Sequence, residues 1–247
     1  MPEARRRSLA VSTALLTLLG TAAPAVAATA PTVLQAPIAH HGGGLLRSTS
    51  GNWAGYAATG GKFTSVRASW VQPSVSCNGT DTWSSFWVGL DGDGSNSVEQ
   101  TGTEADCSGG SPVYSAWYEM YPQYPSDFSS TVRPGDHFTA SVTTNGSGSF
   151  TLTLSDTTAG WSHTVNKSLK SAALASAEVI AEAPSSSSGV LPLANFRTVS
   201  FTGSTVNGQS LGSFGPDAIT MASGSTTKAT TSGLSGGSAF SVTWKHS

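Results

Sequence analysis

The strongest constraint on the fold is the spacing of apolar residues, which almost nowhere follows the 3.6-residue period of an α-helix. Short runs alternate apolar and polar residues instead, as Val66, Ala68 and Trp70 do. Clusters of Gly, Ser, Asn, Asp and Pro separate these runs, and Pro73 ends the first of them. Because side chains alternate between the two faces of a strand, this pattern is typical of a sandwich or barrel.

The same alternation predicts a series of further strands, at 83–90, 98–103, 113–121, 136–144, 149–154, 161–169, 175–183, 197–202, 218–222 and 239–244. The Asn145-Gly146-Ser147-Gly148 turn predicts a hairpin between two of them. One short helix is expected, at 170–177. The fold class expected is therefore all-β, a two-sheet antiparallel β-sandwich of the concanavalin or jelly-roll type.

The first residues have the features of a targeting signal. Arg5–Arg7 form a basic region, an apolar run covers 9–19, and Ala25-Val26-Ala27 matches a cleavage site. The apolar run is too short to span a bilayer, which favours a signal peptide at 1–27 over a signal anchor. We expect a secreted, extracellular protein in which 28–47 is a leader or pro-segment that is removed, leaving one domain at 48–247.

Charge limits the possible partners. The chain has 12 Lys and Arg against 14 Asp and Glu. Arg5–Arg7, Arg47 and Glu3 precede Ser48, so the expected mature chain has 8 basic and 13 acidic residues. No basic patch that could hold nucleic acid is visible, and no later apolar run is long enough to span a membrane. Sparse charge, 11% of all residues, also suits an acidic medium, because few native ion pairs would be broken by acid.

Two cysteines, Cys77 and Cys107, lie in the expected mature chain. In an oxidising compartment we expect them to form one disulfide rather than to remain two buried thiols.

Glu119 shares one face of its expected strand with Trp117 and Tyr121. A carboxylate among aromatic side chains is either a functional group in a cleft, where burial raises its pKa, or an exposed charge beside apolar neighbours. Aromatic residues with carboxylates on a concave sheet also describe a sugar-binding groove.

Glu178 and Glu182 are four residues apart on another expected strand, so their side chains point to the same face. That face is either part of a site or an acidic surface in solvent, and the spacing does not say which Glu matters. Gln100 follows Val98 on a third strand, and a lone Gln is ordinarily a surface residue.

A set of motifs, in order over most of the chain after Ser48, resembles the glutamic peptidases, also called eqolisins. The motifs are Asn52-Trp53-Ala54-Gly55, Trp87-Val88-Gly89-Leu90-Asp91-Gly92, Gln100-Thr101-Gly102, Ala116-Trp117-Tyr118-Glu119 with Tyr121-Pro122, Ala177-Glu178-Val179-Ile180-Ala181-Glu182 and Leu191-Pro192-Leu193-Ala194-Asn195-Phe196. The set is far more specific than any one of its members.

By position, the resemblance implies that Gln100 and Glu182 are the catalytic glutamine and glutamate, with Trp87, Asp91 and Glu119 lining the site. In such a dyad the glutamate activates water as a base and later acts as an acid. The glutamine amide donates a hydrogen bond to the oxyanion. The resemblance implies an acid-acting endopeptidase with protein or peptide substrates and no metal or organic cofactor. We also expect a monomer.

Two departures from the family pattern stand out. Ser115, counted among the site-lining residues, occupies a position where family members often have Asp. Ala183-Pro184 stands where Asp-Phe often follows the catalytic Glu. The first departure bears on the hydrogen bonding or protonation of the site, and the second on the end of the strand.

Two other functions are compatible with these residues. A secreted glycoside hydrolase would use Glu119 and Glu182 as its carboxylate pair. A carbohydrate-binding module would use Trp87, Trp117 and Tyr121 as a platform. Neither has a general need for Gln100, so that residue discriminates between them and a peptidase.

Other motifs are weaker. Gly208-Gln209-Ser210-Leu211-Gly212 matches G-x-S-x-G, but we expect a turn there instead of a strand-to-helix elbow. The Asp91–Ser95 run departs from the EF-hand pattern, and the adjacent pair His40-His41 has no H-E-x-x-H context. We therefore expect no metal site.

Overall fold

The computed structural model describes residues 47–247, so the expected signal peptide and nearly all of the expected leader lie outside the described residues. The described chain is almost entirely β-structure, which confirms the predicted fold class. It contains one short 3₁₀-helix, η1 (Leu211–Phe214). The strands are β1 (Arg47–Ser50), β2 (Trp53–Ala58), β3 (Ser65–Val71), β4 (Ser85–Leu90), β5 (Val98–Ser108), β6 (Ser111–Tyr121), β7 (Ser126–Phe128), β8 (His137–Thr144), β9 (Ser149–Asp156), β10 (Trp161–Ser168), β11 (Ala177–Glu182), β12 (Ser185–Ser186), β13 (Gly189–Val190), β14 (Thr198–Val206), β15 (Gln209–Ser210), β16 (Asp217–Ser223), β17 (Thr226–Thr231) and β18 (Phe240–Trp244).

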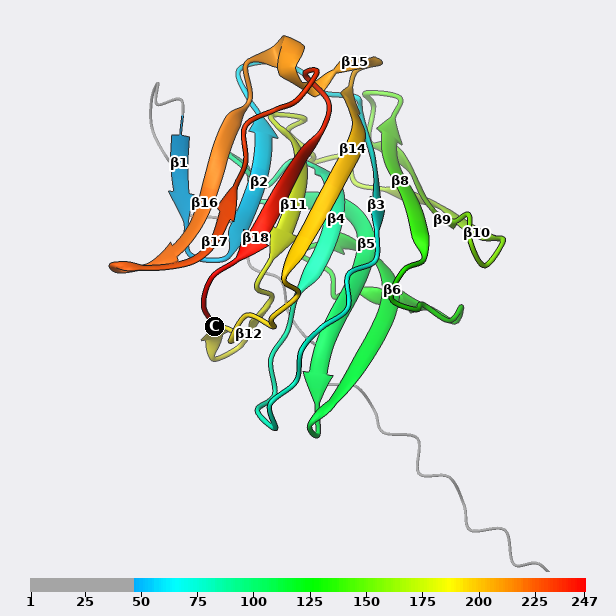
Figure 1. Ribbon diagram of the computed structural model, residues 1–247. Coiled ribbons are helices and arrows are strands. Elements are labelled where there is room, and N and C mark those ends of the chain that lie inside the picture. The colour runs from blue at the N-terminus through cyan, green and yellow to red at the C-terminus, as the bar shows by residue number, and fades with distance from the viewer. Residues whose placement is uncertain (1–46) are drawn as a thin grey trace, which may run out of the picture. The chain divides into compact units, whose positions relative to one another are not determined.

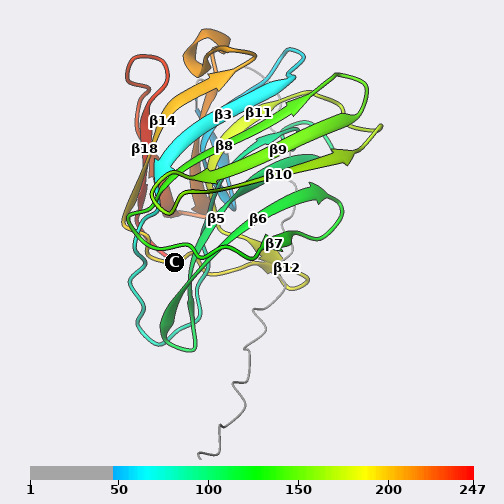
Figure 2. The same ribbon diagram turned by 90° about the vertical axis from the view of Figure 1, so that its right-hand side faces the viewer.

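Most strands form one continuous path of neighbours, β10-β9-β8-β3-β14-β18-β17-β16-β2-β11-β4-β5-β6-β7. All pairs on this path are antiparallel, whereas β1 pairs with β16 in parallel. The path folds over on itself, so that β3, β8, β9 and β14 lie against β4, β5 and β11 (Figures 1 and 2). The result is a sandwich of two layers.

The hydrophobic core lies between these layers. Val179 on β11 and Phe86 on β4 contribute from one layer, and Trp70, Phe138 and Leu152 contribute from the other. The rings of Trp70 and Phe138 stack with their centroids 6.0 Å apart. Each fully buried side chain of this size stabilises the fold by about 1.5–3 kcal/mol. The core therefore fixes which face of each strand is turned away from it.

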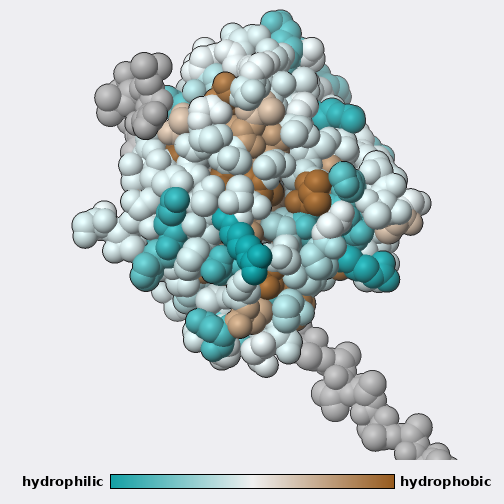
Figure 3. Space-filling view, viewed as in Figure 1, coloured by the Kyte–Doolittle hydropathy of each residue, from teal (hydrophilic) through white to brown (hydrophobic). Residues whose placement is uncertain are grey.

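The face seen in Figure 3 is mostly of intermediate hydropathy, with scattered hydrophilic side chains and several hydrophobic ones near its middle. Hydroxyl groups on neighbouring strands bond to each other on the outer face of the β3-β8-β14 layer, as Ser69 and Thr139 do at 2.8 Å and Thr198 and Thr243 at 3.2 Å. Few charges are needed on a surface of this kind, in line with the sparse charge of the sequence.

The sequence pattern did not predict β1, β2, β7, β12, β13, β15 and β17, of which β2 and β17 are the longest. β2 is buried along its whole length, so its side chains show no alternation between apolar and polar. β17 is a Thr-rich strand whose register with β16 shifts between Met221 and Ala222, which breaks the two-residue period. Strands buried on both faces, or irregular in register, are harder to find by alternation, although β4 and β11 are also buried throughout and were predicted.

The helix expected at 170–177 is wrong. The segment is irregular and leads into β11 at Ala177. Leu174 has a φ of 56°, in the left-handed region that helices avoid. The backbone N–H groups of Leu174 and Ala175 donate to the carboxylate of Asp91, at 2.8 and 2.7 Å, so they are not available to a helix.

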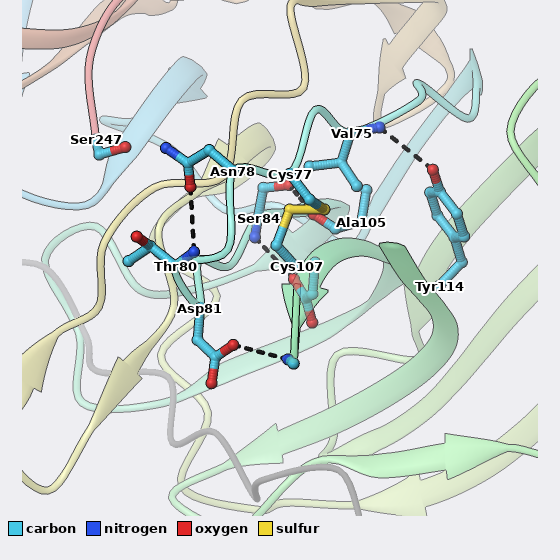
Figure 4. Close-up of a disulfide and its surroundings, with 12 residues drawn as sticks. Val75, Cys77, Asn78, Thr80, Asp81, Ser84, Ala105, Cys107, Tyr114 and Ser247 are labelled. Carbon is cyan, nitrogen blue, oxygen red and sulfur yellow. Dashed lines mark hydrogen bonds between the residues drawn. A yellow bond between two sulfur atoms is a disulfide. The ribbon is translucent and has the colours of Figure 1, made fainter. Parts of the chain in front are cut away.

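The expected disulfide between Cys77 and Cys107 is present, with the two Cα atoms 5.5 Å apart (Figure 4). Cys107 belongs to β5, and its backbone exchanges two hydrogen bonds with Thr82. The backbone N–H of Val75 donates to the hydroxyl of Tyr114 on β6 at 3.2 Å. The bridge therefore fastens the loop between β3 and β4 to the β5–β6 hairpin.

We expect that replacing both Cys77 and Cys107 by Ala lowers the free energy of unfolding by about 3–4 kcal/mol, because the bridge closes a loop with a sequence separation of 30. Urea unfolding followed by tryptophan fluorescence measures this change. The wild-type protein treated with reductant under unfolding conditions is the matched control. A double variant as stable as the oxidised wild type would contradict the expectation.

Candidate active site

The candidate site lies on the face of the β2-β11-β4-β5-β6 layer that points away from the core between the layers. On β11, Val179 packs into that core, so Glu178, Ile180 and Glu182 point to the opposite face. Both glutamates are fully buried. The alternative of an acidic surface in solvent is therefore excluded.

Strand register brings the predicted residues together. Gln100 on β5 lies directly opposite Glu119 on β6 and opposite Gly89 on β4. Gly89 in turn lies opposite Glu178 on β11, which makes one row across four strands. Glu182 lies four positions further along β11 on the same face, with Ile180 between it and Glu178.

Gln100 and Glu119 are joined by a hydrogen bond in which Gln100 Nε2 donates to Glu119 Oε2 at 2.6 Å. Burial raises the pKa of Glu119 to about 9, and the charge of Glu182 acts in the same direction, while the bond from Gln100 opposes them. At acidic and neutral pH, Glu119 is therefore a neutral acid that fixes the position of the Gln100 amide.

Glu182 receives one N–H group on each carboxyl oxygen. Trp87 Nε1 donates to Oε2 at 2.7 Å, and Asn52 Nδ2 donates to Oε1 at 3.1 Å. Burial raises the pKa of Glu182 to about 8, and the N–H groups of Trp87, Trp53 and Asn52 act in the opposite direction, although only those of Trp87 and Asn52 form hydrogen bonds with it. Two strong opposing influences thus act on this carboxyl group.

Trp87 connects the two halves of the site. Its N–H binds Glu182, and its ring extends over Gly89. A Cβ at Gly89 would lie 2.9 Å from Trp87 Cζ3 and 3.2 Å from Gln100 Cβ, so a side chain there would displace the ring or the glutamine. Trp53 meets Trp87 edge to face, with ring centroids 4.8 Å apart. The indole rings form an apolar floor around the polar groups.

Asp91, predicted to line the site, lies at the end of β4 with its carboxylate bonded to the backbone of Leu174 and Ala175. It anchors the segment that precedes β11. The neighbouring Glu99 lies on the face of β5 opposite to Gln100. Burial raises the pKa of Glu99 to about 8, and the charge of Asp91 adds to the rise.

Ser115, also predicted to line the site, donates its hydroxyl to Glu104 Oε2 at 2.9 Å. Burial raises the pKa of Glu104 to about 7, the Ser115 bond opposes this, and Asp127 adds to it. The charge of Glu104 raises the pKa values of both Glu119 and Glu182. Ser115 therefore acts on the predicted dyad only through Glu104.

Sequence reasoning missed two residues of this site, Glu104 and Asn52. Glu104 shares the face of β5 with Gln100, four positions away, and the alternation of the strand could have revealed it. Asn52 belongs to a motif noted in the sequence, but nothing local indicates a bond to a residue 130 positions away.

Within residues 47–247, no group of three His, Cys, Asp or Glu side chains is arranged to hold a metal ion. The same residues include no helix that is both long and apolar enough to cross a membrane.

The chain belongs to the Peptidase A4 family, whose model matches residues 51–244. It is similar to aspergillopepsin-2 of Aspergillus niger, with 32% identity over 177 residues that make up 62% of this chain and 63% of that protein. It is also similar to scytalidopepsin B of Scytalidium lignicola, with 38% identity over 111 residues, 44% of this chain and 41% of that protein. The chain thus spans less than two thirds of the length of these two curated relatives.

Solved structures agree with this assignment. A crystal structure of scytalido-glutamic peptidase with a peptide-based transition-state analogue matches with a TM-score of 0.70 and 29% identity, over 79% of this chain and 98% of that one. Aspergilloglutamic peptidase from Aspergillus niger matches with a TM-score of 0.61 and 30% identity, over 66% of this chain and 99% of that one. Family membership favours a peptidase over the glycoside hydrolase and the carbohydrate-binding module.

We expect stability to fall as pH rises. Glu99, Glu104, Glu119 and Glu182 have pKa values raised from 4.5 to between about 7 and about 9. A raised pKa means that folding favours the protonated form. The contribution to stability is then complete below the unfolded pKa and is lost as pH passes through the folded pKa. Urea unfolding at a series of pH values should give the highest free energy in acid and a decline above about pH 5.

Glu99→Gln is the matched variant, because it removes one titrating group on the face opposite to Gln100. Its free energy of unfolding should decline less steeply with pH than that of the wild type. A wild-type curve that is flat or rises from acid to neutral pH would show that these carboxyl groups do not control stability.

Proposed function

We propose that the protein is a secreted, acid-acting endopeptidase that hydrolyses peptide bonds with a Gln100–Glu182 dyad. The observation that carries the proposal is the arrangement around Trp87, which binds Glu182 through its N–H and lies against the position of Gln100. An amide donor and a carboxyl group are thereby held on one face of one sheet. Membership in the Peptidase A4 family supports the same reaction.

Glu182 is the base that takes a proton from the attacking water, and its acid form then protonates the departing amine. A positioned group of this kind accelerates a reaction by roughly 10²–10⁴-fold. Gln100 does not exchange protons at ordinary pH, so its Nε2 serves as the donor to the oxyanion. One such donor lowers the barrier by about 3 kcal/mol. Neutral Glu119 holds the amide in place through its hydrogen bond.

Burial of the dyad bears on its activation. Glu182 and Glu119 are fully buried and Gln100 is 1% exposed, so a substrate reaches them only after part of the chain moves or is removed. Burial is also the main reason why the pKa of Glu182 is raised to about 8, which keeps the base protonated in acid. Hydration of the opened site removes that cause and lowers the pKa of the base. The proposal that 28–47 is a pro-segment rests on the sequence, since nearly all of this range lies outside the described residues.

Two substitutions test the dyad on denatured casein at acid pH. Glu182→Gln should abolish activity because the base is lost, and Gln100→Ala should lower kcat by about 10²–10³-fold because one oxyanion donor is lost. Glu178→Gln is the matched control, since Glu178 has the same type, strand, face and burial as Glu182. It should keep most of the activity.

Circular dichroism has to show that all three variants are folded. Equal kcat in Gln100→Ala and the wild type would contradict the proposed mechanism. Wild-type activity on xylan or glucan without activity on casein would contradict the proposed peptidase function. Loss of activity in Glu178→Gln but not in Glu182→Gln would show that the base is Glu178 and that its assignment to Glu182 is wrong.

The leader is tested by mass spectrometry of secreted material. We expect the active protein to begin near Leu46-Arg47-Ser48, next to β1, and to have lost the preceding residues. Purified chain that lacks the signal peptide but retains 28–47 should be much less active than the processed form. A fully active enzyme that still carries the segment would refute the pro-segment.

A further inference from the structure

Asn52 binds the candidate base through both its side chain and its backbone. Its Nδ2 donates to Glu182 Oε1 at 3.1 Å, and its carbonyl oxygen accepts the N–H of Ala183 at 2.8 Å. Asn52 is only 6% exposed. It lies just before β2, whose first residue, Trp53, is opposite Glu182 in the β2–β11 pair. The amide therefore sits beside the carboxyl group without reaching across the sheet.

Ser50 determines which end of the Asn52 side chain faces Glu182. The hydroxyl oxygen of Ser50 accepts the backbone N–H groups of Asn52 and Trp53, at 3.3 and 3.1 Å, which occupies both of its lone pairs. The remaining interaction is donation of its O–H, and its partner at 3.1 Å is Asn52 Oδ1. Only the Nδ2 end of the amide is then left to face Glu182.

The bond from Asn52 complements the one from Trp87. Trp87 donates to Oε2 and Asn52 donates to Oε1, so the carboxyl plane is held at both oxygens. Hydrogen bonds of this kind favour the charged form of a carboxyl group. A base held at one oxygen only would rotate more freely and would be harder to ionise.

We propose that Asn52, oriented by Ser50, is a positioning residue that holds the Glu182 carboxylate for the activation of water. The proposal rests on the Gln100–Glu182 dyad proposed above. It also requires that cleavage of the leader occurs before Ser50, because Ser50 and Asn52 have to remain in the mature protein. Ser50 ends β1, which pairs in parallel with β16 and holds this corner in place.

The test compares kcat and KM as functions of pH for processed wild type, Asn52→Ala and Ser50→Ala on one peptide substrate. Asn52→Ala should lower kcat by about 10–100-fold with little change in KM, the cost of one hydrogen bond to a charged group. The acidic limb of its pH profile should move upward by about one unit, because the base loses a donor that favours its ionised form.

Ser50→Ala should change kcat and the acidic limb in the same direction by a smaller amount, since the amide is still present but is no longer oriented. Ser50→Thr retains the hydroxyl, so its kcat and the acidic limb of its pH profile should be closer to those of the wild type than those of Ser50→Ala are. These two variants also decide the question if Asn52→Ala does not fold.

Asn207→Ala is the control for a merely structural role. Asn207 also joins two segments through both ends of its amide, donating to the carbonyl of Lys62 at 2.9 Å and accepting from the N–H of Thr64 at 2.8 Å. It belongs to the turn after β14, outside the sheet face that carries the dyad. Its loss should lower stability and leave the pH profile of kcat unchanged.

A folded Asn52→Ala enzyme with the wild-type pH profile overturns the proposal, whatever its stability. So does Ser50→Ala with the wild-type profile where Asn52→Ala is unfolded. Failure of the dyad is a different result, because it appears as activity retained in Glu182→Gln.

Discussion

Removal of carboxyl groups from water is the physical condition on which the site depends. Glu119 and Glu182 have no exposed surface, and the apolar floor around them includes Trp53, Trp87 and Trp117. Water stabilises a carboxylate far better than such surroundings do, so burial alone favours the neutral acids. Each hydrogen-bond donor placed on these groups then has a large influence, because little solvent competes with it. The two glutamates differ mainly in their donors: Glu182 has Trp87 and Asn52, whereas Glu119 has Gln100.

In the proposed mechanism, this difference gives two residues of the same type different functions. A carboxyl group with two N–H donors is the easier one to ionise and suits a base. A carboxyl group beside another acid, with a single amide donor, stays neutral over a wider pH range. Both pKa values are raised from 4.5, that of Glu119 to about 9 and that of Glu182 to about 8. As the two groups act on each other, they titrate together.

The sequence predicted the sandwich because most strands have one face in the core and one outside it, so that β3, for example, alternates along its whole length. It did not predict β2, whose residues do not alternate between apolar and polar types. The helix expected at 170–177 failed because Asp91, more than 80 residues away, takes the N–H groups of Leu174 and Ala175. The sequence of 170–177 alone does not indicate such a distant hydrogen-bond partner.

The candidate site was predictable to a different degree. Alternation on β11 placed Glu178 and Glu182 on one face but could not choose between them, and Gln100 was distinguished only by the family motif. The contacts of Asn52 and Ser50 could not be predicted from the sequence, because they depend on which atom of the Asn52 amide faces the Glu182 carboxyl group. Residue types and spacings thus predict which strands carry a site. Which hydrogen-bond donor meets which acceptor depends on the register between strands that are far apart in the sequence.

Long-range pairing also determines when the site can exist during folding. Gln100 and Glu119 are 19 residues apart on one hairpin and can meet early. Glu182 reaches Trp87 across 95 residues and Asn52 across 130, and it does so only when β11 has inserted between β2 and β4. Contacts of such separation form late, because the loop has to be closed before they are gained. A chain with the β5–β6 hairpin but without β11 in place holds the amide and lacks the base. In the proposed mechanism, hydrolysis therefore requires a complete sheet.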